Sequence, residues 1–291
     1  MIRFYSILFL LFILLSACRK GDKVPAYLEI DHVTVAAAAV PGSTTSRITD
    51  VWVYADDVLL GTWELPARIP VLKEGNTKIT VAPGIKRNGM YDDRLRYPFY
   101  TWWNGELQLQ KEGNTTIQPE VGYIAQADQW VEAFEDAGVQ LLVSENSDTT
   151  FTRFTATDHP ELASTLIDGS PAGGFVLDEQ RRYMRLYTDE DLTVAGGPIF
   201  LELDYSTNVI LTVGMMFNSG GAPQSFPYVY LVPTITGDVL QPSWNKVYID
   251  LSPIFNQPIS ERDIYFEAEW SPSAGVARVY LDNIKLVRYQ S

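Results

Sequence analysis

The sequence is poor in the side chains that most often carry catalysis and metal binding. Its 291 residues include one cysteine and two histidines, His32 and His159. It contains neither a Gly-x-Ser-x-Gly elbow nor a His-x-x-x-His pair, the motifs of serine hydrolases and zinc enzymes. A single cysteine also excludes intrachain disulfides and multi-cysteine metal sites. We therefore expect both histidines to be surface residues and the protein not to be an enzyme.

Positive charge is scarce as well. The chain has 22 lysines and arginines against 36 aspartates and glutamates, for a net charge of −14. Such a chain is repelled by nucleic acids and by anionic lipid headgroups, so we exclude DNA and RNA binding. Hydrophobic residues nevertheless make up 46% of the sequence, enough to fill the cores of two domains.

The only long hydrophobic run is at the start of the chain. It extends from Phe4 to Leu15, follows Arg3 and ends in Leu15-Ser16-Ala17-Cys18. The run is about half the length of a membrane-spanning helix, which needs roughly 20 residues, and it predicts a secretory signal over residues 1–17. Its end resembles the lipobox of bacterial lipoproteins. This resemblance implies that Cys18 is acylated and anchors the chain in the outer membrane; the alternative is a secreted protein with a chance cysteine.

Almost nothing after the signal has a helical period. Short alternating runs are broken by Gly, Pro, Asn and Asp, which is typical of all-β proteins. The runs over residues 48–54 and 58–63 predict one hairpin, and Gly75-Asn76 predicts the turn of a second. The phrase Lys-Glu-Gly-Asn-Thr occurs at residues 73–77 and again at 111–115, which we interpret as reused turn chemistry. We predict two β-sandwich domains, the first over residues 26–120 and of the immunoglobulin or transthyretin kind.

The first domain resembles lipoproteins of the Bacteroidota that have no known activity. The matching stretches are residues 48–54, Leu60-Gly61 with Glu64-Leu65-Pro66, residues 83–89 and residues 96–100. In that phylum, surface-exposed lipoproteins usually carry an acidic run just after the lipidated cysteine. Here the tether, residues 18–25, is basic instead, which favours the periplasmic side of the outer membrane.

The second domain, residues 121–291, has longer strands. Ile199, Leu201, Leu203 and Tyr205 alternate with polar or aromatic residues, as expected for a two-sheet sandwich. Residues 128–137 are predicted to form a short helix with Asp128 as its N-cap.

Three stretches of this domain resemble galactose-binding-like jelly rolls, the fold of many carbohydrate-binding modules. They are residues 133–138 (AFEDAG), 243–251 (SWNKVYIDL) and 280–286 (YLDNIKL). The resemblance implies that Trp244 is a core residue. It also implies a structural calcium site made by Glu135, Asp136 and Asp282; the alternative is that Asp136 caps a turn and Asp282 pairs with a base.

A glycan-binding face is the first candidate site. Tyr228 and Tyr230 alternate on one strand, and Tyr265, Glu267 and Glu269 share one face of another. Aromatic rings and acids of this kind bind sugar rings in jelly-roll modules, although an ordinary solvated face is the alternative. The pairs Glu267/Glu269 and Glu202/Asp204 also fit the roughly 5–9 Å carboxylate separation of glycosidases, a spacing that an acidic protein produces by chance as well.

The segment from residue 97 to residue 103 is the second candidate site. Its aromatic members are Tyr97, Phe99, Tyr100, Trp102 and Trp103. A small sandwich cannot easily bury all of them, so the surplus either covers the seam between the domains or binds a protein partner. Thr149 lies in an Asp-Thr-Thr sequence that resembles the O-glycosylation motif of exported Bacteroidota proteins.

These observations lead to one main hypothesis and two alternatives. The main hypothesis is a non-catalytic outer-membrane lipoprotein that acts as an accessory subunit of a cell-envelope complex. The first alternative is a glycan-binding module of a polysaccharide-utilisation system, and the less favoured one is a glycosidase. No cofactor is expected apart from the implied calcium ion.

Overall fold

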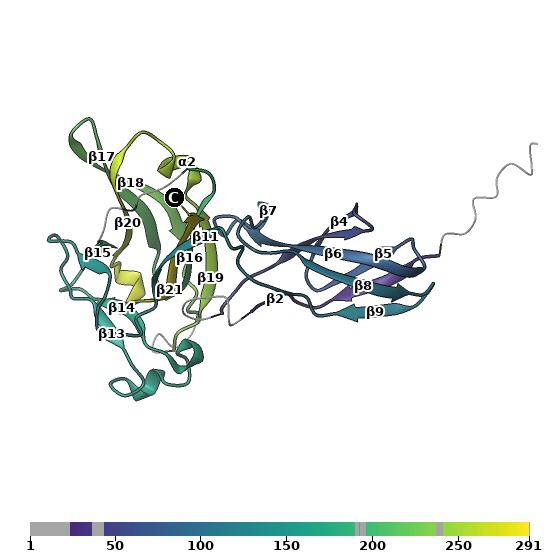
Figure 1. Cartoon of the computed structure of the whole chain (residues 1–291). Coiled ribbons are helices and arrows are strands. Elements are labelled where there is room, and N and C mark those ends of the chain that lie inside the picture. Colours follow the sequence, from purple (N-terminus) through teal and green to yellow (C-terminus); the bar gives the residue numbers. More distant parts are fainter. Residues whose placement is uncertain (1–23, 37–43, 190–191, 193–195, 237–240, 291) are drawn as a thin grey trace, which may run out of the picture.

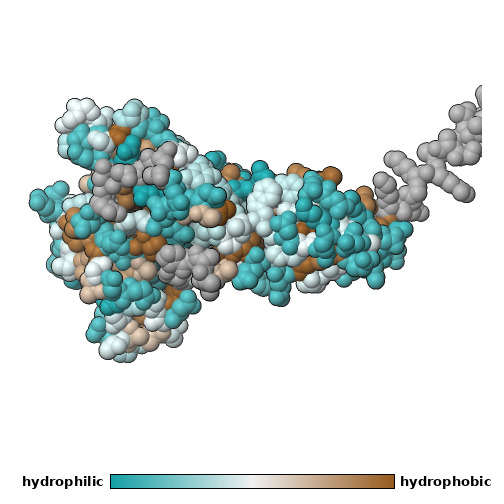
Figure 2. All heavy atoms as spheres, in the orientation of Figure 1, coloured by the Kyte–Doolittle hydropathy of each residue, from teal (hydrophilic) through white to brown (hydrophobic). Residues whose placement is uncertain are grey.

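The protein consists of two β-sandwiches placed end to end (Figure 1, and as spheres in Figure 2). The computed structural model describes residues 24–36, 44–189, 192, 196–236 and 241–290. The all-β prediction is confirmed. The predicted signal, Cys18 and most of the predicted tether lie outside the described residues. Among those that are described, no helix is long and apolar enough to cross a membrane.

The first domain is built from two packed sheets. Its strands are β1 (Ala26–Ile30), β2 (Thr34–Val35), β3 (Asp50–Ala55), β4 (Val58–Glu64), β5 (Ala67–Val71), β6 (Gly75–Lys86), β7 (Arg94–Arg96), β8 (Trp103–Leu109), β9 (Asn114–Ile117) and β10 (Glu120–Val121). One sheet has the order β5-β1-β9, the other has the order β4-β3-β6-β7 with β8 also on β6, and β10 pairs with β2. The hairpin predicted over residues 48–63 is confirmed as the antiparallel pair β3–β4.

The hairpin predicted at Gly75-Asn76 is wrong. Strand β5 pairs with β1, whereas β6 pairs with β3 and β8 in the other sheet. Both copies of the Lys-Glu-Gly-Asn-Thr phrase lie where the chain crosses between the two sheets, from β5 to β6 and from β8 to β9. Gly75 and Glu112 have φ angles of +87° and +61°, so the phrase supplies the left-handed residue that each crossing needs.

The second domain is a sandwich of a six-stranded and a five-stranded sheet. Its strands are β11 (Ala127–Glu132), β12 (Leu141–Val143), β13 (Thr152–Phe154), β14 (Ala172–Leu177), β15 (Tyr183–Thr188), β16 (Ile199–Thr207), β17 (Leu211–Ser219), β18 (Ala222–Leu231), β19 (Asn245–Asp250), β20 (Ser260–Glu269) and β21 (Ala277–Tyr289), with a one-turn helix α2 (Ser252–Phe255). The sheets have the orders β13-β14-β21-β16-β19, with β11 on β21, and β12-β15-β20-β17-β18.

Strand β11 replaces the short helix predicted over residues 128–137. It pairs antiparallel with β21 from Ala127 to Glu132, and Asp128 accepts a hydrogen bond from Arg288 Nε at 3.0 Å. The prediction failed because the local pattern of residues 128–137 does not show that β21, more than 150 residues later in the sequence, pairs with this segment.

The two domains share a continuous hydrophobic seam. The predicted alternation of β16 is observed: Ile199, Leu201, Leu203 and Tyr205 enter the core between the jelly-roll sheets. Phe200 points the other way and packs into the core of the first domain. Figure 1 shows the first domain abutting the sheet that contains β16, β19 and β21.

The aromatic segment mostly fills this seam. Tyr97, Phe99 and Tyr100 are 0–2% exposed, and the ring of Tyr97 lies 5.2 Å from that of Phe200. Trp103 is half-buried against the core of the first domain, and only Trp102, at 47% exposure, is on the surface. The predicted partner surface is therefore wrong for Tyr97, Phe99 and Tyr100, because burying the rings between two domains removes them from solvent.

Glu202 makes the central polar contact of the seam. Its carboxylate accepts hydrogen bonds from Tyr97 Oη at 2.5 Å and from Tyr123 Oη at 2.8 Å, and Lys246 Nζ lies 3.9 Å away. Burial and the nearby Glu202 charge raise the pKa of both tyrosines well above 10. Glu202 and Asp204 are 0% and 3% exposed, so this pair is closed to any sugar and is excluded as a glycosidase site.

Candidate functional site

The outer face of the five-stranded sheet carries a row of cross-strand partners. Arg185 on β15 lies opposite Glu267 on β20, Glu267 opposite Thr212 on β17, and Thr212 opposite Tyr230 on β18. Side chains in one such row point to the same face of a sheet. The register thus places Tyr230, 62% exposed, and Glu267 in one row on this face.

The ring of Tyr265 is buried at this face and is not available to stack on a sugar. It lies opposite Gly214, where an added Cβ would come within 2.3 Å of Tyr265 Cζ, so the ring lies flat across the glycine. The Arg185 guanidinium covers it, with Cζ 4.4 Å from the ring centre. Tyr265 is consequently only 1% exposed, and its predicted role as a sugar-stacking ring is wrong.

Glu267 is held in place by two donors from β15. Its Oε2 accepts a hydrogen bond from Tyr183 Oη at 2.6 Å and a second from Arg185 Nε at 2.7 Å. Burial first, and the Glu267 contact second, raise the pKa of Tyr183, so its hydroxyl keeps its proton at neutral pH. The carboxylate is thereby fixed as an acceptor on the sheet surface.

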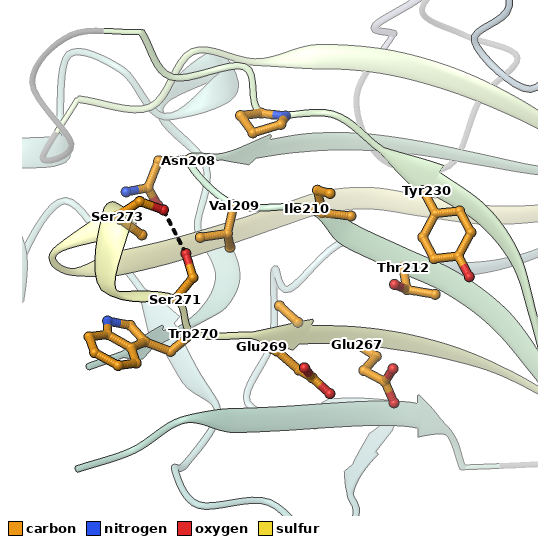
Figure 3. Close-up of a pocket in the computed structure, with 13 residues that line it drawn as sticks. Asn208, Val209, Ile210, Thr212, Tyr230, Glu267, Glu269, Trp270, Ser271 and Ser273 are labelled. Atoms are coloured by element: carbon orange, nitrogen blue, oxygen red, sulfur yellow. Dashed lines mark hydrogen bonds between the residues drawn. The ribbon is translucent and has the colours of Figure 1, made fainter. Parts of the chain in front are cut away.

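A cleft of about 650 Å³ opens beside this row. Figure 3 shows Tyr230 at one end and Trp270 at the other, with Glu267 and Glu269 between them. Glu267 and Trp270 are three residues apart in the sequence, which corresponds to about 10 Å of extended backbone. We call this hollow the Tyr230–Trp270 cleft. Its mixture of aromatic rings and a few fixed polar groups is typical of a small-molecule site.

Tyr228 does not belong to the cleft. A β-bulge places Val229 opposite Val213 and Pro227 opposite Gly214, so Tyr228 has no partner residue in the ladder. Its ring packs against the sandwich core and its hydroxyl donates to the carbonyl of Asp250 at 2.9 Å. The prediction that Tyr228 and Tyr230 share one face is wrong because the bulge reverses the alternation.

Several residues of the site were missed from the sequence. Trp270 follows the last residue of β20, and its indole N–H donates to Gly275 O at 2.7 Å, which fixes the ring at one end of the cleft. Arg185 and Thr212 are on strands whose neighbours were unknown. Only Trp270 gave a usable signal, as an aromatic residue ending the strand that carries Glu267 and Glu269.

The predicted calcium ligands do not form a cluster. Glu135 and Asp136 are exposed, and Asp136 caps a turn by accepting a hydrogen bond from Gly138 N at 2.8 Å. Asp282 is fully buried, and its Oδ2 has no hydrogen-bond partner. Among the described residues, no three His, Cys, Asp or Glu side chains could hold a metal ion together. The three carboxylates therefore do not fit the site that the resemblance implied.

The remaining predicted residues lie apart from the cleft. His32 is exposed beside Asp31, and His159 is half-buried, 3.1 Å from Glu161. Thr149 is on the wall of a separate hollow of about 350 Å³, and its glycosylation stays a prediction. Trp244 is half-buried against a small satellite cluster and not in the main core, with its N–H donating to Thr165 O at 2.7 Å.

Comparison with known proteins gives distant structural likenesses. No protein-family model matches the chain, and a search among curated proteins found no match. A family 29 carbohydrate-binding module complexed with mannohexaose is 14% identical, covers 56% of this chain and 93% of its own, and gives a TM-score of 0.34. A family 61 module in complex with β-1,4-galactotriose is 14% identical over 52% of this chain and 88% of its own, with a TM-score of 0.31.

One likeness spans both domains. A structure described as a carbohydrate-binding module from the β-sandwich superfamily covers 90% of this chain and 98% of its own. The identity is 11% and the TM-score 0.39. Likenesses this distant do not establish a shared ligand.

Proposed function

We propose that this protein binds a neutral glycan in the Tyr230–Trp270 cleft and does not cleave it. The observation that carries the proposal is the exposed Tyr230 ring, in one cross-strand row with Thr212 and the fixed carboxylate of Glu267. A pyranose ring has a C–H face that packs on an aromatic ring, and hydroxyl groups that donate to carboxylates. The cleft offers both kinds of contact side by side.

The charge of the cleft favours a neutral sugar. Glu267 and Glu269 both line it, and among its described lining residues none is basic. Of the nearby cations, Arg185 is already bound to Glu267, and the Arg182 guanidinium lies over the Trp270 ring, 5.1 Å from its centre. A uronic acid or a sulfated sugar would place a second negative charge beside Glu269, which is exposed, at a cost in affinity.

Replacing Tyr230 with alanine is expected to weaken binding of the neutral glycan about 30-fold, since an aromatic hot-spot contact contributes about 2 kcal/mol. Titration calorimetry with a panel of neutral hexose and pentose oligosaccharides measures this effect. Phe226→Ala is the matched control: Phe226 is an exposed aromatic residue on the same strand but outside the cleft, so its loss should leave affinity unchanged. Failure of the wild-type protein to bind any member of the panel would contradict the proposal.

The absence of cleavage is proposed because Oε2 of Glu267 is held by Tyr183 and Arg185, which leaves Oε1 as the acceptor for a sugar hydroxyl. A general acid must deliver a proton to the leaving oxygen, and a carboxylate oxygen that already accepts hydrogen bonds from two side chains is not free to do so. We expect no new reducing ends when the bound oligosaccharide is incubated with the protein. Turnover that disappears in Glu267→Gln would show that the protein is a glycosidase.

Glycan binding replaces the accessory-subunit hypothesis as the favoured function. That hypothesis depended on the aromatic segment being available to a partner, and three of its five rings are buried in the seam. The predicted lipid anchor is compatible with either function.

Acylation of Cys18 can be tested by cell fractionation. We expect the wild-type protein in the outer-membrane fraction and the Cys18→Ser variant in the soluble fraction. Equal distribution of the two proteins would contradict acylation.

A further inference from the structure

The outer face of the larger sheet of the first domain has a hollow of its own. Its volume is about 380 Å³, and it is lined by residues that include Trp52, Arg94, Arg96, Pro98 and Trp102. Trp52 is on β3 and the two arginines are on β7, which flanks β6 on the far side from β3. We call this the Trp52 hollow. It shares no lining residue with the Tyr230–Trp270 cleft, which belongs to the other domain.

The aromatic rings of the Trp52 hollow are held in fixed positions. Trp52 lies over Gly84, where an added Cβ would come within 2.3 Å of Trp52 Cζ3. Trp102 stacks on Tyr54 with a centroid distance of 5.8 Å and an interplanar angle of 14°. Because both rings are already packed on one side, a ligand that stacks on them loses little side-chain entropy to ordering.

The arginines of the hollow are also preorganised. Arg96 Nη1 donates to Tyr54 Oη at 3.1 Å, and its Cζ lies 5.5 Å from the Trp102 ring centre. Arg94 Nε lies 3.3 Å from Oδ1 of Asp50, a fully buried carboxylate that also binds Lys86 at 3.1 Å. A guanidinium has five donors, so each arginine retains N–H groups beyond these contacts.

The local charge of this face is opposite to that of the chain. This face has three cations, Lys86, Arg94 and Arg96, and two carboxylates, those of Asp50 and Glu64. It therefore has a local excess of one positive charge, whereas the whole chain has a net charge of −14. Arginine binds carboxylate and sulfate groups with paired, directed hydrogen bonds. The hollow thus combines flat rings with donors suited to an anion.

The surroundings favour a small ligand over a protein partner. The register puts Lys78 and Glu106 opposite each other on this face, and both are polar, as is the exposed Asn104 beside Trp102. A stable protein interface buries about 800 Å² per partner around an apolar centre. Here the apolar surface is confined to a few rings that line a concave hollow.

We propose that the Trp52 hollow is a second glycan site, selective for an acidic sugar unit. The C–H face of the sugar packs on Trp52 and Trp102, and its carboxylate or sulfate group accepts hydrogen bonds from Arg96 and Arg94. The two sites of the protein then have opposite charge preferences, neutral in the jelly roll and acidic in the first domain. The proposal does not depend on the Tyr230–Trp270 cleft.

The test is titration calorimetry of the full mature chain with three short oligosaccharides. Trigalacturonate carries carboxylates, its fully methyl-esterified form is the neutral counterpart, and a sulfated galactose oligosaccharide carries sulfates. We expect binding of one or both acidic ligands, weakened at least 10-fold by Trp52→Ala and by Arg96→Gln and reduced by added salt. The ligand that binds tells whether carboxylate or sulfate is recognised.

Control variants distinguish binding at the Trp52 hollow from binding at the Tyr230–Trp270 cleft. Tyr230→Ala should leave binding of the acidic ligand unchanged, as should Tyr91→Ala, which removes an exposed ring outside the hollow. Thermal unfolding of each variant checks that it is folded. Arg96→Gln removes hydrogen-bond donors but leaves every aromatic ring of the hollow in place. Binding of neither acidic ligand, or acidic binding that both variants leave intact, would overturn the proposal whatever happens at the cleft.

Discussion

Replacing Glu202 with alanine is expected to lower the free energy of unfolding by about 3–5 kcal/mol, because one partner of a buried charge network is removed. Glu202 is fully buried and accepts hydrogen bonds from Tyr97 and Tyr123. Without it, both hydroxyls lose a charged acceptor inside the seam. Lys246, 6% exposed, loses one of its two neighbouring carboxylates. Urea unfolding followed by tryptophan fluorescence measures the change.

Two further variants make this expectation specific. Tyr97→Phe removes one donor but keeps the ring in the seam, so its effect should be smaller, about 1–3 kcal/mol. Glu179→Ala removes an exposed glutamate and should change stability by less than about 0.5 kcal/mol. A loss below about 1 kcal/mol for Glu202→Ala would mean that water or another residue takes over its hydrogen bonds, and that the seam is looser than described.

Much of the fold could be predicted because the signals of its strands are local, but the Gly75-Asn76 turn and the residue 128–137 segment were misassigned because strand pairing is not local. The alternation of Ile199, Leu201, Leu203 and Tyr205 states which side of β16 enters a core, and the β3–β4 hairpin follows from two runs and a short turn. Even the outward direction of Phe200 and Glu202 follows from that alternation. Their contacts with the first domain could not be predicted, because burial of the outward face of β16 depends on a domain that is distant in the sequence.

The candidate site was harder to predict for the same reason. Glu267 and Tyr230 were named from the sequence, but Arg185 joins them only through the order of strands in the sheet. The bulge that turns Tyr228 inward follows Pro227, and a proline within a strand is a sign of an edge or a bulge, but it does not show which way the next side chains point. Trp52 stands out only in the structure, where Gly84 provides the flat surface beneath its ring.

The stability of the protein is expected to fall as pH rises from about 5 to 8, because of Asp282. Burial raises the pKa of this carboxyl to about 8 from an ordinary value of 3.8, and the charges of Asp204 and Glu135 add to the effect. Between these two values the folded chain binds a proton that the unfolded chain does not, so stability decreases with pH by up to about 1.4 kcal/mol per unit. The Asn283 N–H and Lys246 oppose the shift without cancelling it.

Lys285 gives the opposite slope at higher pH. Burial, with the charge of Lys246, lowers the pKa of this ammonium group from 10.5 to about 8. Above pH 8 the unfolded chain therefore binds the extra proton, and stability should rise again toward pH 10. Together the two groups predict that the free energy of unfolding has a minimum near pH 8. Urea unfolding at a series of pH values, with EDTA present, measures this dependence.

Asp282→Asn isolates the first limb of this curve. The amide keeps an acceptor for the Asn283 N–H, which the wild-type Oδ1 binds at 2.7 Å, but it cannot ionise. The decline between pH 5 and 8 should therefore flatten while the rise above pH 8 remains. Asp136→Asn, an exposed aspartate whose turn hydrogen bond asparagine can also make, should keep the wild-type curve. If Asp282→Asn and the wild type had the same slope, Asp282 would be ionised in the folded protein, and its unpartnered oxygen would have to be reached by a counterion or by water.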